Sequence, residues 1–217
     1  MKHRSTASDF FSEGEKETIT ATIREVESRT IGEIVVMVVG SSDSYTDAEI
    51  LGGILLGSFL SFVLTALFFH SSIWNFVPMS LIFFFPSEWS VRRVTPLKAL
   101  FISRERKEQA VQRKAISSFY EHGPYKTKMD TGVLFFLSLL ERKMWVLADK
   151  GIDKKIGQES LNQFAALVSQ GIRDGRACES LCGTIRKIGE LLSRDFPMAP
   201  GDTNELPDYV ITEESSS

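Results

Sequence analysis

The sequence is poor in the residue types on which nucleophilic and metal chemistry depends. Its 217 residues include only two cysteines and three histidines. Two cysteines are too few for a disulfide framework, and no histidine stands near them at a zinc spacing. Cys178 and Cys182 are four residues apart in a helical pattern, which indicates small packing residues and favours a reducing compartment.

Catalytic and nucleotide-binding motifs are missing as well. The chain contains no G-x-S-x-G, no P-loop and no H-E-x-x-H. His3, His70 and His122 fall in a tail, a turn and a helix end. A phosphatase built on this chain would therefore have to rely on metal and carboxylates alone.

An excess of positive charge is also absent. The formal net charge is −3, so the composition gives no reason to expect nucleic-acid binding. Residues 1–9 are polar and lack the apolar core of a secretory signal peptide, so we expect a flexible N-terminus.

What the chain does have is a long apolar insert. No ionisable residue occurs from Ile50 to Phe69, a length of about 30 Å as a helix, which is enough to cross a bilayer core. A second uncharged run, Ser71 to Ser87, follows, and Trp74 and Trp89 suit its two interfaces. The pattern predicts a two-helix transmembrane hairpin over residues 48–91, in contact with the lipid bilayer.

Basic residues indicate how this hairpin is oriented. The connecting turn has no Lys or Arg, whereas six basic residues follow the second run: Arg92, Arg93, Lys98, Arg104, Arg106 and Lys107. By the positive-inside rule both termini are cytoplasmic. We therefore expect a two-span protein of the plasma membrane, which in a bacterium is the inner membrane.

Small residues recur every four positions in the first run. Gly53, Gly57 and Ser61 share one face, which allows close approach of another helix. That helix is the second span, a membrane-protein partner or a second copy of the chain in a homo-oligomer.

The rest of the chain has an α/β pattern. Ser12 and Glu15 form a capping box, and the β-branched run Glu33–Val39 is typical of a central strand. After the insert we expect these elements: a helix at 104–120, strands at 132–139 and 143–148, and helices at 160–173 and 177–194.

Connectivity predicts the sheet and the domain limits. A helical crossover makes the first two strands parallel, and a tight turn makes the third antiparallel. We expect one three-layer α/β domain, a small mixed sheet flanked by helices. It would comprise residues 10–47 and 92–208, with a disordered tail at 209–217.

Short motifs in this order resemble the TPM domain family. They are Phe11-Ser12-Glu13, Thr30-Ile31-Gly32-Glu33-Ile34, Asp130-Thr131-Gly132-Val133-Leu134, Glu141-Arg142-Lys143 and Val146-Leu147-Ala148-Asp149-Lys150-Gly151-Ile152. The stretch Gly201–Asp208 resembles the closing signature of a bacterial membrane-embedded branch of this family.

The resemblance implies an α/β sandwich-like fold and Ca²⁺ or Mg²⁺ binding. It also implies acid phosphatase activity in some members, one of them a thylakoid-lumen protein, and roles in photosystem II repair or as receptor accessory proteins in others. Soluble members carry an acidic pair near the N-terminus, where this chain has only Asp9.

Topology places several carboxylates at one end of the sheet. Asp130 begins the second strand, Asp149 and Asp153 follow the third in one loop, and Glu33 begins the first. Oxygen ligands of this kind could hold Ca²⁺ or Mg²⁺. The alternative is that they are turn formers and solvated charges, neutralised by Lys150 and Lys154.

The other end of the sheet leads into the membrane insert. Asp43, Asp47 and Glu141 would gather there, where open α/β sheets bind ligands. A site at this end would meet lipid headgroups or a membrane partner. Two functions follow as hypotheses: a membrane-anchored interaction or assembly module, or a divalent-cation-dependent acid phosphatase.

Overall fold

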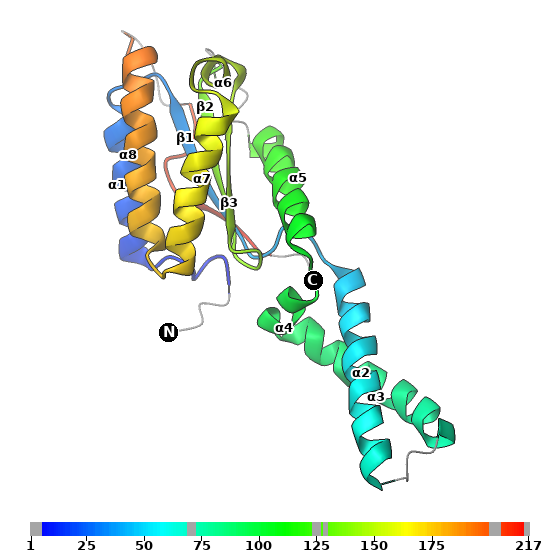
Figure 1. Cartoon of the computed structure of the whole chain (residues 1–217). Helices are drawn as coiled ribbons and strands as arrows, with labels where there is room; N and C mark the ends of the chain where they lie inside the picture. Colours follow the sequence, from blue (N-terminus) through cyan, green and yellow to red (C-terminus); the bar gives the residue numbers. More distant parts are fainter. Residues whose placement is uncertain (1–5, 69–72, 123–126, 128–129, 200–204, 215–217) are drawn as a thin grey trace. The chain divides into compact units, whose positions relative to one another are not determined.

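The chain divides into two compact units. A computed structural model describes residues 6–68, 73–122, 127, 130–199 and 205–214. Residues 1–43 and 108–217 form one unit, here called the α/β unit, and residues 44–107 form the other, the helical unit. The helical unit contains the expected insert, residues 48–91, and extends beyond it on both sides. Figure 1 labels the elements of both units.

A four-stranded mixed sheet lies at the centre of the α/β unit. Its order is β3 (Lys143–Ala148), β2 (Gly132–Ser138), β1 (Glu33–Val39) and β4 (Ile211–Glu213). β1 and β2 are parallel, from Glu33 opposite Gly132 to Val39 opposite Ser138, and β3 is antiparallel to β2. The mixed sheet that the connectivity predicted is therefore confirmed.

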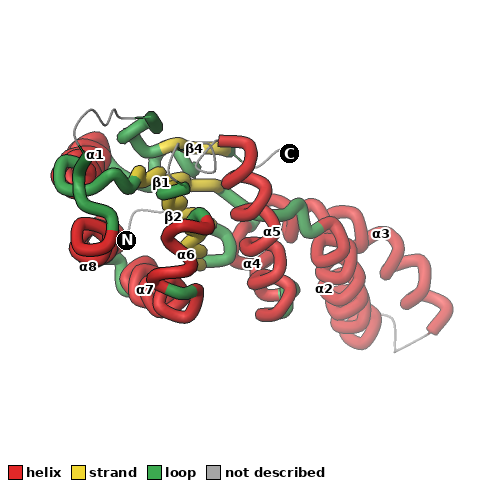
Figure 2. Tube along the Cα trace, turned by 90° about the horizontal axis from the view of Figure 1, so that it is seen from above, coloured by secondary structure: helices red, strands yellow, loops and turns green. Residues whose placement is uncertain are grey.

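Helices cover both faces of this sheet, which gives three layers (Figure 2). On one face, alternate strand residues such as Val36 and Phe135 pack against three helices: α1 (Glu13–Glu27), α7 (Gln158–Arg173) and α8 (Ala177–Asp195). On the other face, Val35 and Phe136 pack against α5 (Arg104–His122). β1 and β2 are buried along their whole length, which is why their sequences are continuously apolar.

Two segments of the α/β unit differ from the sequence-based expectation. Residues Lys150–Ile156 form a short helix, α6, where we expected a loop, because the Asp149 carboxylate caps it and Ile152 enters the core. Residues Ile211–Glu213 form β4, parallel to β1, although the tail from residue 209 was expected to be disordered. Strand pairing satisfies backbone groups of β1 that an open edge would leave unpaired.

The helical unit consists of α2 (Thr46–Phe68), α3 (Ile73–Arg93) and α4 (Thr95–Leu100), followed by the first residues of α5. α2 and α3 pack against each other in antiparallel directions, since Gly53 lies against Glu88 and Gly57 against Phe84. Pro78 and Pro86 both lie inside α3.

Candidate functional site

The four carboxylates expected to bind metal occupy different environments. Glu33 is buried and accepts hydrogen bonds from the backbone N–H groups of Glu205 and Leu206, at 3.2 and 3.3 Å. Asp130 is exposed and has a left-handed backbone with φ of 54°. Glu33 is therefore used to hold the C-terminal segment, and Asp130 is a turn residue facing solvent.

Asp149 and Asp153 belong to α6. Oδ1 of Asp149 accepts the Lys150 backbone N–H at 2.7 Å, and Asp153 is exposed one turn further along the helix. Oδ2 of Asp149 is buried and has no hydrogen-bond partner among the described residues. Within the described residues no three Asp, Glu, His or Cys side chains come close enough together to hold a metal ion. The arrangement is that of a helix cap with one unsatisfied oxygen.

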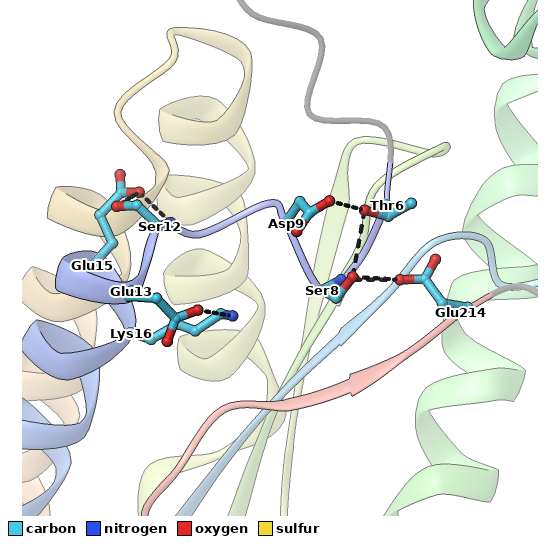
Figure 3. A network of polar contacts seen from close by, with 8 residues as sticks. All are labelled: Thr6, Ser8, Asp9, Ser12, Glu13, Glu15, Lys16 and Glu214. Carbon is cyan, nitrogen blue, oxygen red and sulfur yellow. Dashed lines mark hydrogen bonds and ion pairs between the residues drawn. The ribbon is translucent and has the colours of Figure 1, made fainter.

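Asp9, the residue nearest to the acidic pair of the soluble TPM proteins, is also exposed. Its carboxylate accepts the Thr6 hydroxyl at 2.8 Å (Figure 3). The neighbouring Ser8 donates from its backbone N–H and its hydroxyl to Glu214, at 3.0 and 3.1 Å. Figure 3 also shows the capping box, in which Glu15 accepts the Ser12 backbone N–H at 2.8 Å. These contacts tie the N-terminal segment to the C-terminal one.

A carboxyl cluster that the sequence reading missed joins α1, β1 and the C-terminal segment. The Glu27 carboxyl accepts the Ile34 backbone N–H at 2.8 Å and is hydrogen-bonded to Asp208. Asp208 in turn accepts a hydrogen bond from Arg24 Nε at 2.7 Å. Burial above all, and then the charges of Glu33 and Asp208, raise the pKa of Glu27 to about 8. The Gly201–Asp208 signature contained a signal, Asp208, but nothing in it pointed to Glu27.

At the carboxyl ends of β1 and β2 lies a second polar group. The buried Glu141 accepts the Ser42 backbone N–H at 3.1 Å and the hydroxyl of Ser138. The hydroxyls of Ser42 and Ser138 are themselves 2.7 Å apart. This network closes the turn between β2 and β3 onto the segment that follows β1.

A shallow cavity of 280 Å³ adjoins this end of the sheet. It is lined by Ser42, Asp43, Ala110, Arg113 and Lys114. Lys114 also forms an ion pair of 2.8 Å with Glu213 of β4. Of the three acidic residues expected at this end, Asp43 lines the cavity and Glu141 lies in the buried network, whereas Asp47 belongs to the helical unit and pairs with Arg106. The cavity presents two cationic groups and one carboxylate to solvent.

The small residues of α2 line its contact with α3. A Cβ added to Gly53 would lie 2.7 Å from Cβ of Glu88, and one added to Gly57 would lie 3.1 Å from backbone atoms of Phe84. Ser61 is buried and its hydroxyl donates to the Gly57 carbonyl at 2.8 Å. The helices approach closely at Gly53 and Gly57 because glycine itself has no side chain at these two positions.

Buried ionic contacts close the Thr46 end of the helical unit. Lys98 Nζ and the Glu49 carboxylate are 2.6 Å apart and both side chains are largely buried. Lys107 Nζ donates to the Ala99 carbonyl at 2.7 Å. These contacts gather the start of α2, all of α4 and the start of α5 at one end of the helical pair.

Apolar side chains cover the outside of the same two helices. Of the 23 large apolar residues that are exposed in the described part of the chain, 18 belong to residues 44–107. Trp74, for example, is 86% exposed and Phe85 is 70% exposed. Monomeric soluble proteins rarely expose apolar surface of this extent, which marks a binding or membrane surface.

By length and hydropathy, one described helix could cross a membrane. It is α2, with a mean hydropathy of 2.2, whereas α3 is not long and apolar enough by the same criterion. The described residues therefore support one span, and the expected two-span topology is not supported by this measure. A buried core helix can pass this test too, so it is weak evidence by itself, but only 28% of the apolar window of α2 is buried.

Comparison with known proteins gives a likeness of fold. No family model matches the chain, and no curated protein does either. Among solved structures, the NMR structure of the BA42 protein from the psychrophilic bacterium Bizionia argentinensis is similar, with a TM-score of 0.60 and 18% sequence identity. The match covers 96% of this chain and 99% of that one. At this level of identity, the comparison shows that the chain shares the α/β fold of BA42.

Proposed function

We propose that this chain is a membrane-anchored interaction module of the TPM type. In this proposal the α/β unit is held at the cytoplasmic face of the plasma membrane by the helical insert, and binds a membrane protein or a second copy of the chain. The observation that carries the proposal is the exposed apolar surface of residues 44–107. The order of the TPM-like motifs supports the family assignment, and the likeness of fold to BA42 agrees with the α/β fold that this family implies.

The dimensions of α2 suit a membrane span. Its 23 residues are about 34 Å long at 1.5 Å per residue, slightly more than the hydrocarbon core of a bilayer. Outward-facing residues such as Leu55, Phe59 and Phe62 are each more than half exposed. In water this surface would be costly, whereas in lipid it is the ordinary surface of a spanning helix.

In the proposal α3 returns across the membrane beside α2. It is less apolar than α2, because it contains Asn75, two prolines and, in its last turns, Glu88 and two arginines. Its outward residues Leu81, Ile82 and Phe85 are nevertheless 64% to 70% exposed. A helix packed against α2 through glycines shares the membrane depth of α2, which favours a two-helix hairpin.

An interaction role accounts for the α/β unit better than catalysis does. Its surface at the carboxyl ends of β1 and β2 offers Arg113, Lys114 and Asp43 around a shallow cavity, which suits a polar segment of a partner protein. The phosphatase hypothesis requires a metal, and the described residues bring no three ligands together. Among the described residues, Asp149 Oδ2 is the one buried carboxylate oxygen without a hydrogen-bond partner, which favours Ca²⁺ or Mg²⁺. Calorimetric titration of the wild type and Asp149→Asn tests that alternative.

Cysteine accessibility in intact cells tests the proposed topology. A Ser72→Cys variant carries a thiol between α2 and α3, and a Ser216→Cys variant carries one at the C-terminus. If both termini are cytoplasmic and the chain crosses the membrane twice, an impermeant maleimide labels the Ser72→Cys variant in intact cells. It labels the Ser216→Cys variant only after lysis. The wild-type protein is the control for labelling of the native cysteines, of which Cys178 is half-buried and Cys182 is buried. Labelling of both variants, or of neither, in intact cells would refute the topology.

Cross-linking in isolated membranes tests the interaction role separately. The proposal requires a discrete adduct of the full-length chain, with a second copy or with a membrane protein, at native abundance. A chain that remains monomeric under every cross-linking chemistry would contradict the interaction role while leaving the membrane anchor intact.

A further inference from the structure

The basic residues that follow α3 fall into two groups. Lys98 pairs with Glu49, Arg106 pairs with Asp47, and Lys107 donates to the Ala99 carbonyl. These three cations are used inside the helical unit. The other three are Arg92, Arg93 and Arg104, here called the free arginines.

The free arginines are exposed and have no carboxylate partner among the described residues. Arg93 lies over the Trp89 ring, 5.6 Å from its centroid, and that contact leaves the guanidinium donors unused. Guanidinium groups present several N–H donors in a plane that matches phosphate oxygens. Their surface therefore has the chemistry to bind phosphate groups.

Contacts within the helical unit place these arginines at one end of the helix pair. A Cβ on Gly52, in the second turn of α2, would meet Val91 and Phe101 at 2.9 Å, so the segment between those two residues returns to α2. Arg92 and Arg93 directly follow Val91. Arg104 begins α5 two residues before Arg106, whose partner Asp47 lies in the first turn of α2.

Exposed apolar side chains lie before and between the free arginines in the sequence. Leu100 of α4 is 76% exposed, and Val94 and Trp89 are also exposed. A short helix with outward apolar groups, flanked by unpaired arginines, is the pattern of a segment that lies in the headgroup layer. The described remainder of the pair, from Ile50 to Phe68 and from Ile73 to Ser87, has no charged residue.

We infer that the free arginines form a binding surface for anionic phospholipid headgroups, which rests on the membrane anchor proposed above. Complementary charge argues for this occupant, because the cytoplasmic leaflet is negative and attracts basic residues next to a span. Each basic residue near such a surface strengthens partitioning by about fivefold, so three together amount to roughly a hundredfold.

Native mass spectrometry of the full-length protein in detergent tests this inference. The protein is titrated with phosphatidylglycerol or with phosphatidylcholine of the same acyl chains, and the number of retained lipids is measured. The wild type retains phosphatidylglycerol at concentrations at least tenfold below those needed for phosphatidylcholine. The variant Arg92→Gln/Arg93→Gln/Arg104→Gln loses that preference.

A matched variant removes three positive charges elsewhere. Lys154, Lys155 and Lys187 are exposed residues of the α/β unit, and Lys154→Gln/Lys155→Gln/Lys187→Gln keeps the wild-type preference. Equal loss in both triple variants, or equal retention of the two lipids by wild type, overturns the inference. Inorganic phosphate that abolishes lipid retention at millimolar concentration would point to a free anion as the ligand and would overturn it too. Carbonate extraction of the wild type shows whether the membrane anchor itself has failed, and so separates that outcome from failure of the lipid-binding inference.

Discussion

We predict that the Glu27 carboxyl makes the docking of the C-terminal segment depend on pH. The charges of two carboxylates act on it: Glu33, which accepts hydrogen bonds from Glu205 and Leu206, and Asp208, which pairs with Arg24. Three carboxyl groups thus share a partly buried site with one arginine. We predict that protonated Glu27 stabilises this arrangement and that its ionisation weakens it.

The sign of the effect follows from the two pKa values. Unfolded, Glu27 has its ordinary pKa near 4.5, and in the folded chain its pKa is about 8. Between these values the folded state binds the proton and the unfolded state does not, so stability falls as pH rises. The contribution is complete below pH 4.5 and is lost by about pH 8.

Between the two pKa values, each pH unit lowers the free energy of unfolding by about 1.4 kcal/mol. From pH 5 to pH 7.5 the free energy of unfolding would fall by up to roughly 3 kcal/mol, less where solvent screens the group. Glu27→Gln removes the titration and still accepts the Ile34 N–H, while its amide can donate to Asp208. The variant should therefore be more stable than wild type at pH 7.5 and nearly independent of pH in this range.

Two measurements check the prediction. Urea unfolding of the full-length protein between pH 5 and 8 gives the change in the free energy of unfolding with pH. Hydrogen exchange of the peptide covering residues 205–214 shows whether the C-terminal segment opens before the rest of the protein. Glu25→Gln is the control, because Glu25 is on the same helix and makes exposed ion pairs with Arg29 and Arg186. If Glu27→Gln and wild type lose stability in parallel as pH rises, the reasoning about this cluster is wrong.

Two further predictions concern the packing of helices, and one concerns the reactivity of a thiol. Gly189→Ala should destabilise the protein by about 1–3 kcal/mol, since the new Cβ would lie 2.4 Å from Val26. Gly183→Ala on the same helix meets nothing within 4 Å and should raise the stability by about 0.5–1 kcal/mol. Thermal unfolding measures both variants, and equal shifts in melting temperature would contradict the α1–α8 contact. Cys178 should resist iodoacetamide at pH 8, because burial raises the pKa of its thiol to about 12; rapid alkylation of the folded protein, read by mass spectrometry, would refute this. Gly57→Leu should separate α2 from α3 and lower the melting temperature in detergent, since backbone atoms of Phe84 are 3.1 Å from the Cβ position; an unchanged melting temperature would show that the helices do not depend on this contact.

Local sequence patterns were sufficient for most elements of the α/β unit. The run Glu33–Val39 matches β1 residue for residue, because a strand buried on both faces is apolar throughout. The parallel pairing of β1 and β2 follows from the helical crossover between them. These features depend on short stretches of chain, where periodicity and handedness leave few alternatives.

Contacts between distant residues could not be read in the same way. β4 has only three residues and gains its stability from β1, about 170 positions earlier in the chain. Glu27 is an ordinary helix residue in sequence, and its raised pKa arises from burial and from Glu33 and Asp208. Likewise, nothing in the sequence indicated the contacts made by two of the carboxylates expected to bind metal: Glu33 accepts backbone N–H groups of Glu205 and Leu206, and Asp149 caps α6.

The central claim is that residues 44–107 anchor the chain in a lipid bilayer, and alkaline carbonate extraction tests it most directly. Membranes from cells that produce the full-length protein are washed at pH 11 and separated by centrifugation, and the protein is quantified in both fractions. The apolar surface of α2 and α3 predicts that the protein stays in the membrane pellet and is released only by detergent. Recovery of the protein in the carbonate supernatant would contradict the anchor and the proposed function that depends on it.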